Sequence, residues 1–260
     1  MEFIGTGRQG IVRIKVINPV ISKDIFPDVV QSFATISNAE KVDVEFISHG
    51  PSSIESEVDV AMAQPGLLDS ALRAERDGYD GLIINCMCDP GLQACRELLQ
   101  IPVTAPAESS AHYASILAER FSIITTLNEA VSQFRRLCGY YGFTERLASV
   151  RAVEIPVLEL EDNWSLVLER FMQGIKLACE EDGAQAVIPG CTGFSTLIEA
   201  MERQVREDNV KVVIIDPVKA AVFLLESLIR FGVQPVRTAP NKQVHLPGDF
   251  AEIKRWSEIN

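Results

Sequence analysis

Short apolar segments that suit β-strands alternate with helix-forming segments through most of the 260-residue chain. Such alternation predicts parallel sheets built from βαβ units, and therefore an α/β protein. We expect strands over residues 11–17, 42–47, 81–85, 101–105, 121–126, 148–156, 186–189 and 210–215. We expect helices over residues 57–77, 89–99, 109–119, 164–180, 196–206 and 217–231, and one more helix after Asn128.

Two matching segments each end a predicted strand with a cysteine and then enter a glycine-containing turn. The first reads Gly81-Leu-Ile-Ile-Asn-Cys86, and the second reads Ala186-Val-Ile-Pro-Gly-Cys191. Their similar architecture predicts two intimately packed α/β lobes, each a parallel sheet flanked by helices. We assign residues 1–115 with 217–260 to the lobe that carries Cys86, and residues 116–216 to the lobe that carries Cys191.

Thiols in matching positions at two strand ends indicate a pair of acid/base groups. Ligands of parallel α/β proteins bind at the carboxyl ends of the strands, where both thiols are expected. One thiolate could remove a proton from one face of a substrate carbon while the opposite thiol returns a proton to the other face. The alternative is that both cysteines are small buried hydrophobic residues, the commoner role of a lone cysteine.

The other residues at the strand ends are small, polar and uncharged. They include Asn18, the segment 48–50 with Gly50, the paired hydroxyls Thr125 and Thr126, and Thr192 with Gly193. Helices that begin near Asp89 and after Cys191 direct unpaired N–H groups at the same region, where they can lower a thiol pKa and stabilise an oxyanion. Asp89 is the expected N-cap of the first of these helices, with Pro90 at the first helical position.

Two motifs that could indicate a metal or a nucleotide cofactor stand in the wrong context. Residues 86–88 form a C-x-C element, but none of His49, His112 and His245 stands at a spacing that completes a zinc site. Residues 5–10 spell G-x-G-x-x-G, yet a strand follows them, whereas the dinucleotide motif follows a strand and opens a helix. We therefore expect neither a metal nor a cofactor.

The charge and hydropathy of the chain exclude several kinds of partner. Its 24 Lys and Arg residues against 36 Asp and Glu residues give a net charge of −12, which disfavours nucleic acid and anionic membranes. No apolar run reaches the roughly 18–20 residues of a membrane span, and the first residues do not read as a signal peptide. Six cysteines in such a chain are typical of reduced thiols, so we expect a cytoplasmic protein that acts on a small molecule.

Several segments resemble the aspartate/glutamate/hydantoin racemase superfamily, most closely its hydantoin and allantoin racemase branch. The resemblance runs from about Ile11 to Ala221. It is carried by residues 16–19 (Val-Ile-Asn-Pro), 50–55 (Gly-Pro-Ser-Ser-Ile-Glu), 86–92 (Cys-Met-Cys-Asp-Pro-Gly-Leu), 121–127 (Phe-Ser-Ile-Ile-Thr-Thr-Leu), 189–193 (Pro-Gly-Cys-Thr-Gly) and 215–218 (Ile-Asp-Pro-Val).

This resemblance implies a fold, a reaction and a set of site residues. The fold is two pseudosymmetric α/β lobes with the active site in the cleft between them, and the enzymes are cofactor-independent and commonly homo-oligomeric. The catalytic pair would be Cys86 and Cys191. The substrate would be lined by Thr125, Thr126, Thr192 and Gly193, with Asn18, Gly50 and Met87 nearby.

Departures from the superfamily pattern bear on the substrate. Its amino-acid racemases typically carry Asp-Ser-Gly after the first strand, Cys-Asn-Thr at the first cysteine and Gly-Cys-Thr-His at the second. This chain reads Asn18-Pro19, Cys86-Met87-Cys88 and Gly190-Cys-Thr-Gly193 at those positions. Without these helper groups we expect a carbon more acidic than that of a free amino acid, such as the stereocentre of a 5-substituted hydantoin or an allantoin-like cyclic ureide. The alternatives are an amino-acid racemase, a decarboxylase or isomerase of the superfamily, and a metabolite-binding protein without activity.

Overall fold

The computed structural model describes residues 12–23, 25–232, 234–236, 238 and 250–252 of the chain. The G-x-G-x-x-G segment at residues 5–10 lies outside the described residues. Within them, eight strands and eight α-helices alternate along the chain. The apolar pattern predicts the eight strands and seven of these helices, but not the helix over Pro27–Ile36.

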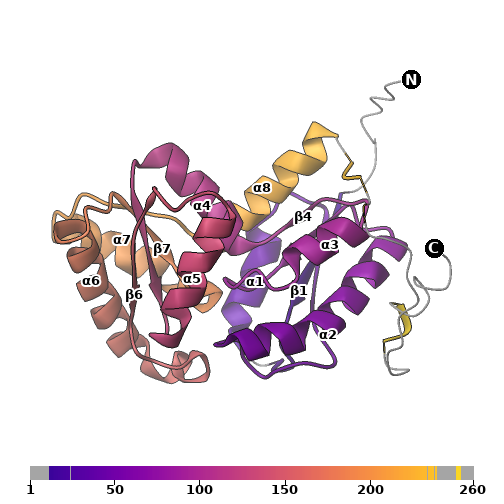
Figure 1. Cartoon of the computed structure of the whole chain (residues 1–260), viewed down its shortest axis with the longest axis horizontal. Coiled ribbons are helices and arrows are strands. Elements are labelled where there is room, and N and C mark those ends of the chain that lie inside the picture. Colours follow the sequence, from indigo (N-terminus) through magenta and orange to yellow (C-terminus); the bar gives the residue numbers. More distant parts are fainter. Residues whose placement is uncertain (1–11, 24, 233, 237, 239–249, 253–260) are drawn as a thin grey trace.

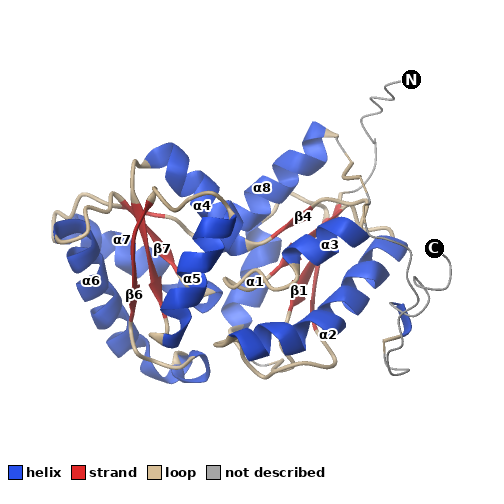
Figure 2. Cartoon of the chain, in the orientation of Figure 1, coloured by secondary structure: helices blue, strands red, loops and turns tan. Residues whose placement is uncertain are grey.

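Two four-stranded parallel sheets lie side by side, each with helices packed against it (Figure 2). The first has the order β2-β1-β3-β4, formed by β1 (Arg13–Asn18), β2 (Lys41–Phe46), β3 (Gly81–Ile84) and β4 (Val103–Thr104). The second has the order β6-β5-β7-β8, formed by β5 (Phe121–Thr125), β6 (Leu147–Ala152), β7 (Ala186–Pro189) and β8 (Val213–Ile214). The two orders correspond strand for strand, which confirms the predicted fold of two α/β lobes.

The helices surround the two sheets (Figure 1). They are α1 (Pro27–Ile36), α2 (Glu57–Arg76), α3 (Leu92–Leu98), α4 (Pro106–Leu117), α5 (Glu129–Tyr140), α6 (Trp164–Glu180), α7 (Ile198–Glu207) and α8 (Pro217–Phe231), with the short 3₁₀ helices η1 (Val157–Glu159), η2 (Glu161–Asn163) and η3 (Thr192–Leu197). Helix α8, drawn in yellow-orange, follows the second sheet in the chain but returns to the first. There the hydroxyl of Thr104 in β4 donates a hydrogen bond to the carbonyl of Ala221, at 3.0 Å.

The expectation that Asp89 caps the helix that follows it was wrong. Helix α3 begins only at Leu92, after Gly91 in the left-handed region, and Asp89 itself has φ 44°. The Asp89 carboxylate instead accepts hydrogen bonds from the backbone N–H groups of Ala107, at 2.9 Å, and Glu108, at 2.8 Å. It therefore caps α4, whose partly positive N-terminus attracts a carboxylate.

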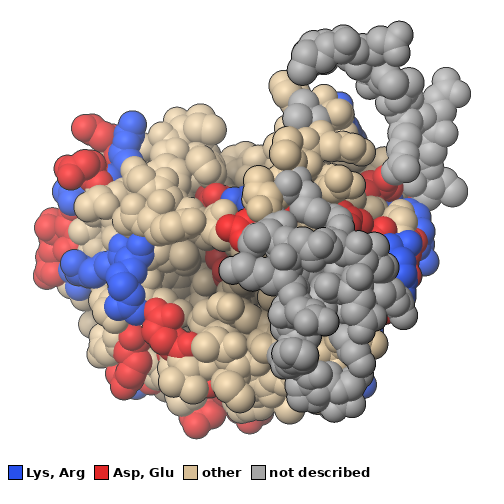
Figure 3. Space-filling view, turned by 45° about the vertical axis from the view of Figure 1, so that its right-hand side comes forward, with Lys and Arg blue, Asp and Glu red and all other residues tan. Residues whose placement is uncertain are grey.

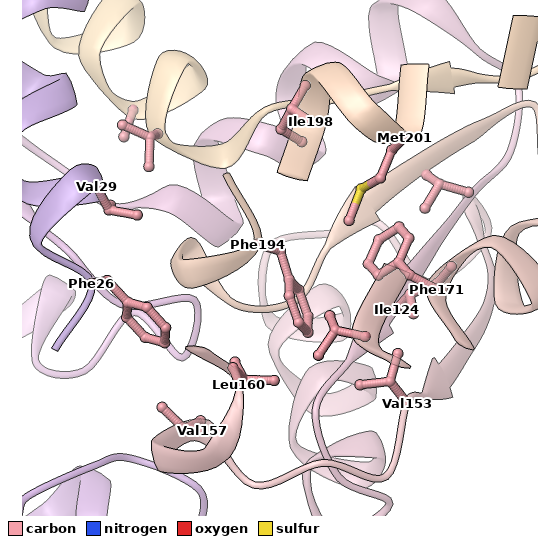
Figure 4. Packing of buried hydrophobic residues seen from close by; sticks show 14 of the residues in the cluster. Phe26, Val29, Ile124, Val153, Val157, Leu160, Phe171, Phe194, Ile198 and Met201 are labelled. Atoms are coloured by element: carbon pink, nitrogen blue, oxygen red, sulfur yellow. The ribbon is translucent and has the colours of Figure 1, made fainter. Parts of the chain in front are cut away.

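One apolar core continues from the first lobe into the second. Phe26 and Val29 of the first lobe belong to the same buried cluster as Leu160 and Phe194 of the second (Figure 4). Each buried aliphatic or aromatic side chain of this kind contributes about 1.5–3 kcal/mol relative to exposure. Packing therefore fixes how the two lobes face each other, and with it the shape of the space between them.

Charges of both signs occur on the face shown in Figure 3, where Lys and Arg side chains lie next to Asp and Glu. No broad basic area of the kind that binds nucleic acid is visible among the described residues of that face. Of the helices that the structure describes, none combines the length and the apolar character needed to cross a membrane.

Candidate active site

A cavity lies between the two lobes at the carboxyl ends of the central strands β1, β3, β5 and β7. Of the residues selected from the sequence, it is lined by Asn18, Cys86, Met87, Thr125, Thr126, Cys191 and Thr192. Other lining residues include Phe26, Ser53, Glu55, Asn85, Cys88, Phe134, Val157 and Gly190. Both predicted acid/base thiols thus face one space, which is the geometry that a two-sided proton transfer requires.

Cys191 is placed by the end of β7, where the chain passes very close to the end of β5. The N–H of Gly190 donates a hydrogen bond to the carbonyl of Ile124 at 2.7 Å. A Cβ atom on Gly190 would lie 2.8 Å from the Cα of Thr125, so only glycine fits there. This close approach sets the Cys191 thiol beside Thr125 and Thr126 at the wall of the cavity.

The surroundings of Cys191 favour its protonated form. Burial is the main cause, and it raises the pKa of the thiol to about 12, although N–H groups of Gly193 and Phe194 act in the opposite direction. Both N–H groups belong to η3, directly after the cysteine. Cys191 therefore holds its proton at neutral pH and presents it to the cavity.

Two predicted site residues, Gly193 and Gly50, lie outside the lining of the cavity. Gly193 stands behind Cys191, where a Cβ atom would lie 2.5 Å from the ring of Phe26, so the missing side chain makes room for that ring. Gly50 is half-buried against Ile47 and Ala63.

Cys86 stands in a tight turn at the end of β3, beside a second thiol. The N–H of Asp89 donates to the carbonyl of Cys86 at 3.0 Å, which closes the turn. Cys88 also lines the cavity, and its thiol donates to the side-chain oxygen of Gln133 at 3.5 Å. Its hydrogen bond with Cys86, followed by burial, raises the pKa of Cys88 well above that of a free cysteine.

Asp89 anchors this turn to the rest of the protein. Besides the two N–H groups of α4, its buried carboxylate accepts the hydroxyl of Tyr141 at 2.9 Å. Burial raises the pKa of Asp89 to about 7 against the lowering effect of these three donors. The turn that carries Cys86 is therefore tied by one side chain to the start of α4 and to Tyr141, the residue that follows α5.

A pair of amides lies at the ends of β1 and β3. Asn85 donates to the side-chain oxygen of Asn18 at 2.7 Å, and Asn18 donates to the carbonyl of Glu45 at 3.3 Å. The side-chain oxygen of Asn85 is buried and has no hydrogen-bond partner within the described part of the chain. An acceptor without a donor is costly when buried, so this oxygen stands ready to accept from a ligand.

The structure adds Phe26, Glu55 and Asn85 to the residues selected from the sequence. The sequence offered a reason to select two of them, since Asn85 immediately precedes Cys86 and Glu55 ends the motif at residues 50–55. No local pattern in the sequence points to Phe26, because it reaches the cavity through the packing of one lobe against the other. Among the described residues, no group of three or more His, Cys, Asp and Glu side chains is arranged to hold a metal ion.

Comparisons with known proteins show which family the chain is similar to. The hydantoin racemase of Paenarthrobacter aurescens is 34% identical over 225 residues, covering 86% of this chain and 93% of the relative. The hydantoin racemase of Pseudomonas sp. (strain NS671) is 32% identical over 225 residues, covering 85% of this chain and 87% of the relative. The structure of the allantoin racemase from Klebsiella pneumoniae superposes with a TM-score of 0.83 at 35% identity, covering 92% of this chain and 98% of the other.

The sequence model of one family, described as Asp/Glu/Hydantoin racemase, matches residues 14–225. That range includes both strand-end cysteines and all of both sheets except Arg13, the first residue of β1. The chain therefore belongs to the Asp/Glu/hydantoin racemase family.

Proposed function

We propose that this protein is a cofactor-independent racemase of a cyclic ureide, either a 5-substituted hydantoin or an allantoin-like ring. As a member of a racemase family it is an isomerase, and proteins similar to it in sequence and in structure are named for these two kinds of ring. The observation that carries the proposal is that Cys86 and Cys191 end equivalent strands and line one cavity.

The reaction moves two protons, one from the substrate carbon to a thiolate and one from the opposite thiol back to that carbon. The C–H bond at the stereocentre breaks, its proton goes to a thiolate, and the electron pair moves into the neighbouring carbonyl to give an enolate. The opposite thiol then delivers its proton to the other face of the carbon, and the enolate carbonyl re-forms. Cys191, which holds its proton at neutral pH, is suited to deliver it, and Cys86 would be the opposite group.

The remaining predicted residues would hold the ring between the thiols. The hydroxyls of Thr125, Thr126 and Thr192 line the cavity, and we propose that they bind ring carbonyls. Asn18 orients Asn85, and Met87 supplies apolar contact. Gly193 and Gly50 would act from behind the wall, Gly193 through its N–H at Cys191 and Gly50 through the packing of its loop.

A racemisation assay on a panel of compounds tests the proposal. Single enantiomers of 5-benzylhydantoin, allantoin and glutamate are followed by polarimetry with the purified protein and no added cofactor, against a blank without protein. We expect loss of optical rotation for at least one ring and none for glutamate. Racemisation of glutamate alone would favour the amino-acid alternative, and release of CO₂ from an arylmalonate would favour the decarboxylase alternative.

Three further expectations belong to this proposal. The lobes would divide as residues 1–115 with 217–260 and residues 116–216, which the return of α8 to the first sheet supports. We also propose a homo-oligomer and a cytoplasmic location. Size-exclusion chromatography with light scattering measures the first of these two, and cell fractionation measures the second.

A further inference from the structure

The cavity has an uneven balance of charge. Among the described residues that line it, Glu55 is the single carboxylate, and none is Lys, Arg or His. A ligand that carries a carboxylate would lose its hydration and find no cation to pair with. A neutral ligand with N–H groups would instead find a carboxylate acceptor.

Glu55 is held in place from both lobes. One of its oxygens, Oε1, accepts the backbone N–H of Val157 in the second lobe at 2.6 Å. The other, Oε2, accepts the hydroxyl of Ser53 in its own loop at 3.3 Å. Each carboxylate oxygen can accept more than one hydrogen bond, so both retain capacity for a ligand.

Other groups around the cavity also favour a ligand that carries hydrogen-bond donors. The side-chain oxygen of Asn85 is a second acceptor, buried and without a partner among the described residues. The charge of Glu55 also reaches the reacting groups, since it adds to burial and to the effect of Cys86 in raising the pKa of Cys191. Glu55 lines the same cavity as Cys86 and Cys191, so its carboxylate can contact a ring that is bound between the two thiols.

We propose that Glu55 determines specificity by accepting an N–H of a neutral ureide ring and by excluding rings with an anionic substituent. This inference rests on the proposed function and narrows it to neutral cyclic ureides. Hydrogen bonds to an ionised acceptor are about twice as strong as those between neutral groups, so the carboxylate matters more than an amide of the same shape.

The test compares Glu55→Gln with Glu57→Gln and the parent protein. Glutamine preserves the size of the side chain and an oxygen that can accept from Val157. Glu57 is a matched control because it pairs with Arg136 of the second lobe but does not line the cavity. Neutral 5-benzylhydantoin and anionic hydantoin-5-acetate serve as substrates at pH 7, and thermal unfolding verifies that each variant is folded.

We expect the parent to prefer the neutral ring by about a hundredfold in kcat/KM, the scale of one charge-assisted hydrogen bond gained or one charge left unpaired. Glu55→Gln should raise KM for the neutral ring about tenfold with little change in kcat, and should raise kcat/KM for the anionic ring about tenfold. Glu57→Gln should change neither. Equal losses on both substrates would show that Glu55 only joins the lobes, and would overturn the inference.

Binding measurements separate this inference from the proposed function. Isothermal titration with unsubstituted hydantoin and with hydantoin-5-acetate needs no turnover. The same charge preference in binding, without racemisation of any ring, would refute the function and support the role of Glu55. Binding of neither ring, or equal binding of both by the parent and by Glu55→Gln, would overturn the inference.

Discussion

The two strand-end cysteines occupy equivalent places in equivalent sheets, but their surroundings differ. Cys191 is followed at once by η3, whose N–H groups face its sulfur, and burial keeps the thiol protonated. Cys86 is followed by a tight turn with a second thiol and a buried carboxylate. The duplicated architecture therefore places two thiols at equivalent strand ends, and the local turns give them different surroundings.

This inequality suits a reaction that needs one protonated and one deprotonated group at the same time. Two thiols that line one cavity lose their protons in two separate steps, because the charge of the first thiolate opposes ionisation of the second. An η3 turn on one side and a Cys-Met-Cys-Asp turn on the other can separate the two steps. The predictions below test how far the two sides differ.

The largest effect is expected from removing either thiol. Cys86→Ser and Cys191→Ser should each lower kcat for ring racemisation by at least about a thousandfold, because serine is a far weaker acid and base than cysteine at neutral pH. Polarimetry with a single enantiomer measures this loss. Cys95→Ala serves as the control, because Cys95 is a buried cysteine of α3 outside the cavity. Full activity in both serine variants would remove the cysteines from the mechanism.

The next effect concerns the ionisation of Cys191. Because its pKa is raised to about 12, the thiolate fraction should still increase about tenfold per pH unit from pH 8 to pH 10, whereas an ordinary thiol with a pKa of about 8.5 levels off. Alkylation of Cys191 by iodoacetamide, measured by peptide mass spectrometry in the Cys86→Ser background, reports this slope. A plateau near pH 9 would contradict the raised pKa of Cys191.

A smaller effect is expected from Asp89→Asn, which tests the anchor of the Cys86 turn. The carboxylate accepts hydrogen bonds from three donors, and the amide of asparagine would turn its NH₂ group toward one of them. Losing that hydrogen bond should lower the free energy of unfolding by about 1–3 kcal/mol. Urea denaturation measures that cost, and kcat should fall about tenfold as the turn shifts. Asp208→Asn, which loosens an exposed ion pair with Lys176, should leave the free energy of unfolding close to that of the parent. If the Asp89→Asn protein were as stable and as active as the parent, the turn would keep its conformation without the Asp89 carboxylate.

The smallest effect is expected from Cys88→Ala, which asks whether the second thiol takes part. The variant loses the hydrogen bonds of the Cys88 thiol with Cys86 and, at 3.5 Å, with Gln133. It keeps the Cys86 sulfur in the cavity, so kcat/KM should stay within about threefold of the parent. Steady-state kinetics on the same ring measure it. A loss of a hundredfold or more would assign the proton transfer on that side to Cys88 or to the pair.

Local patterns in the sequence predicted most of the fold. Strand β7 and helices α6 and α8 have the expected bounds because their apolar periodicity depends on neighbouring residues alone. Contacts between distant residues were beyond such reasoning. Asp89 was assigned to the helix next to it, although its carboxylate caps a helix 18 residues further on, and the bond from Val157 to Glu55 spans 102 residues.

The residues of the candidate site also fall into those that local sequence patterns predict and those that depend on distant contacts. The positions of Cys86, Cys191 and the threonines follow from where strands end, which is visible in the sequence. Helix α1 was not expected, and Phe26 at its start reaches the cavity with φ 50°, supported by the core that both lobes share. Predicting which residues line a site between two lobes therefore requires knowing how the lobes pack, and no local sequence pattern contains that information.

The most direct test of the two-thiol account is solvent deuterium exchange at the stereocentre. With one enantiomer of 5-benzylhydantoin in D₂O, every inverted product molecule should carry deuterium at that carbon, because the proton it receives comes from a thiol in exchange with solvent. Cys86→Ser and Cys191→Ser should each still exchange one enantiomer without inverting it, and the two variants should exchange opposite enantiomers. Inverted product that retains its original hydrogen, or exchange of the same enantiomer by both variants, would contradict the account.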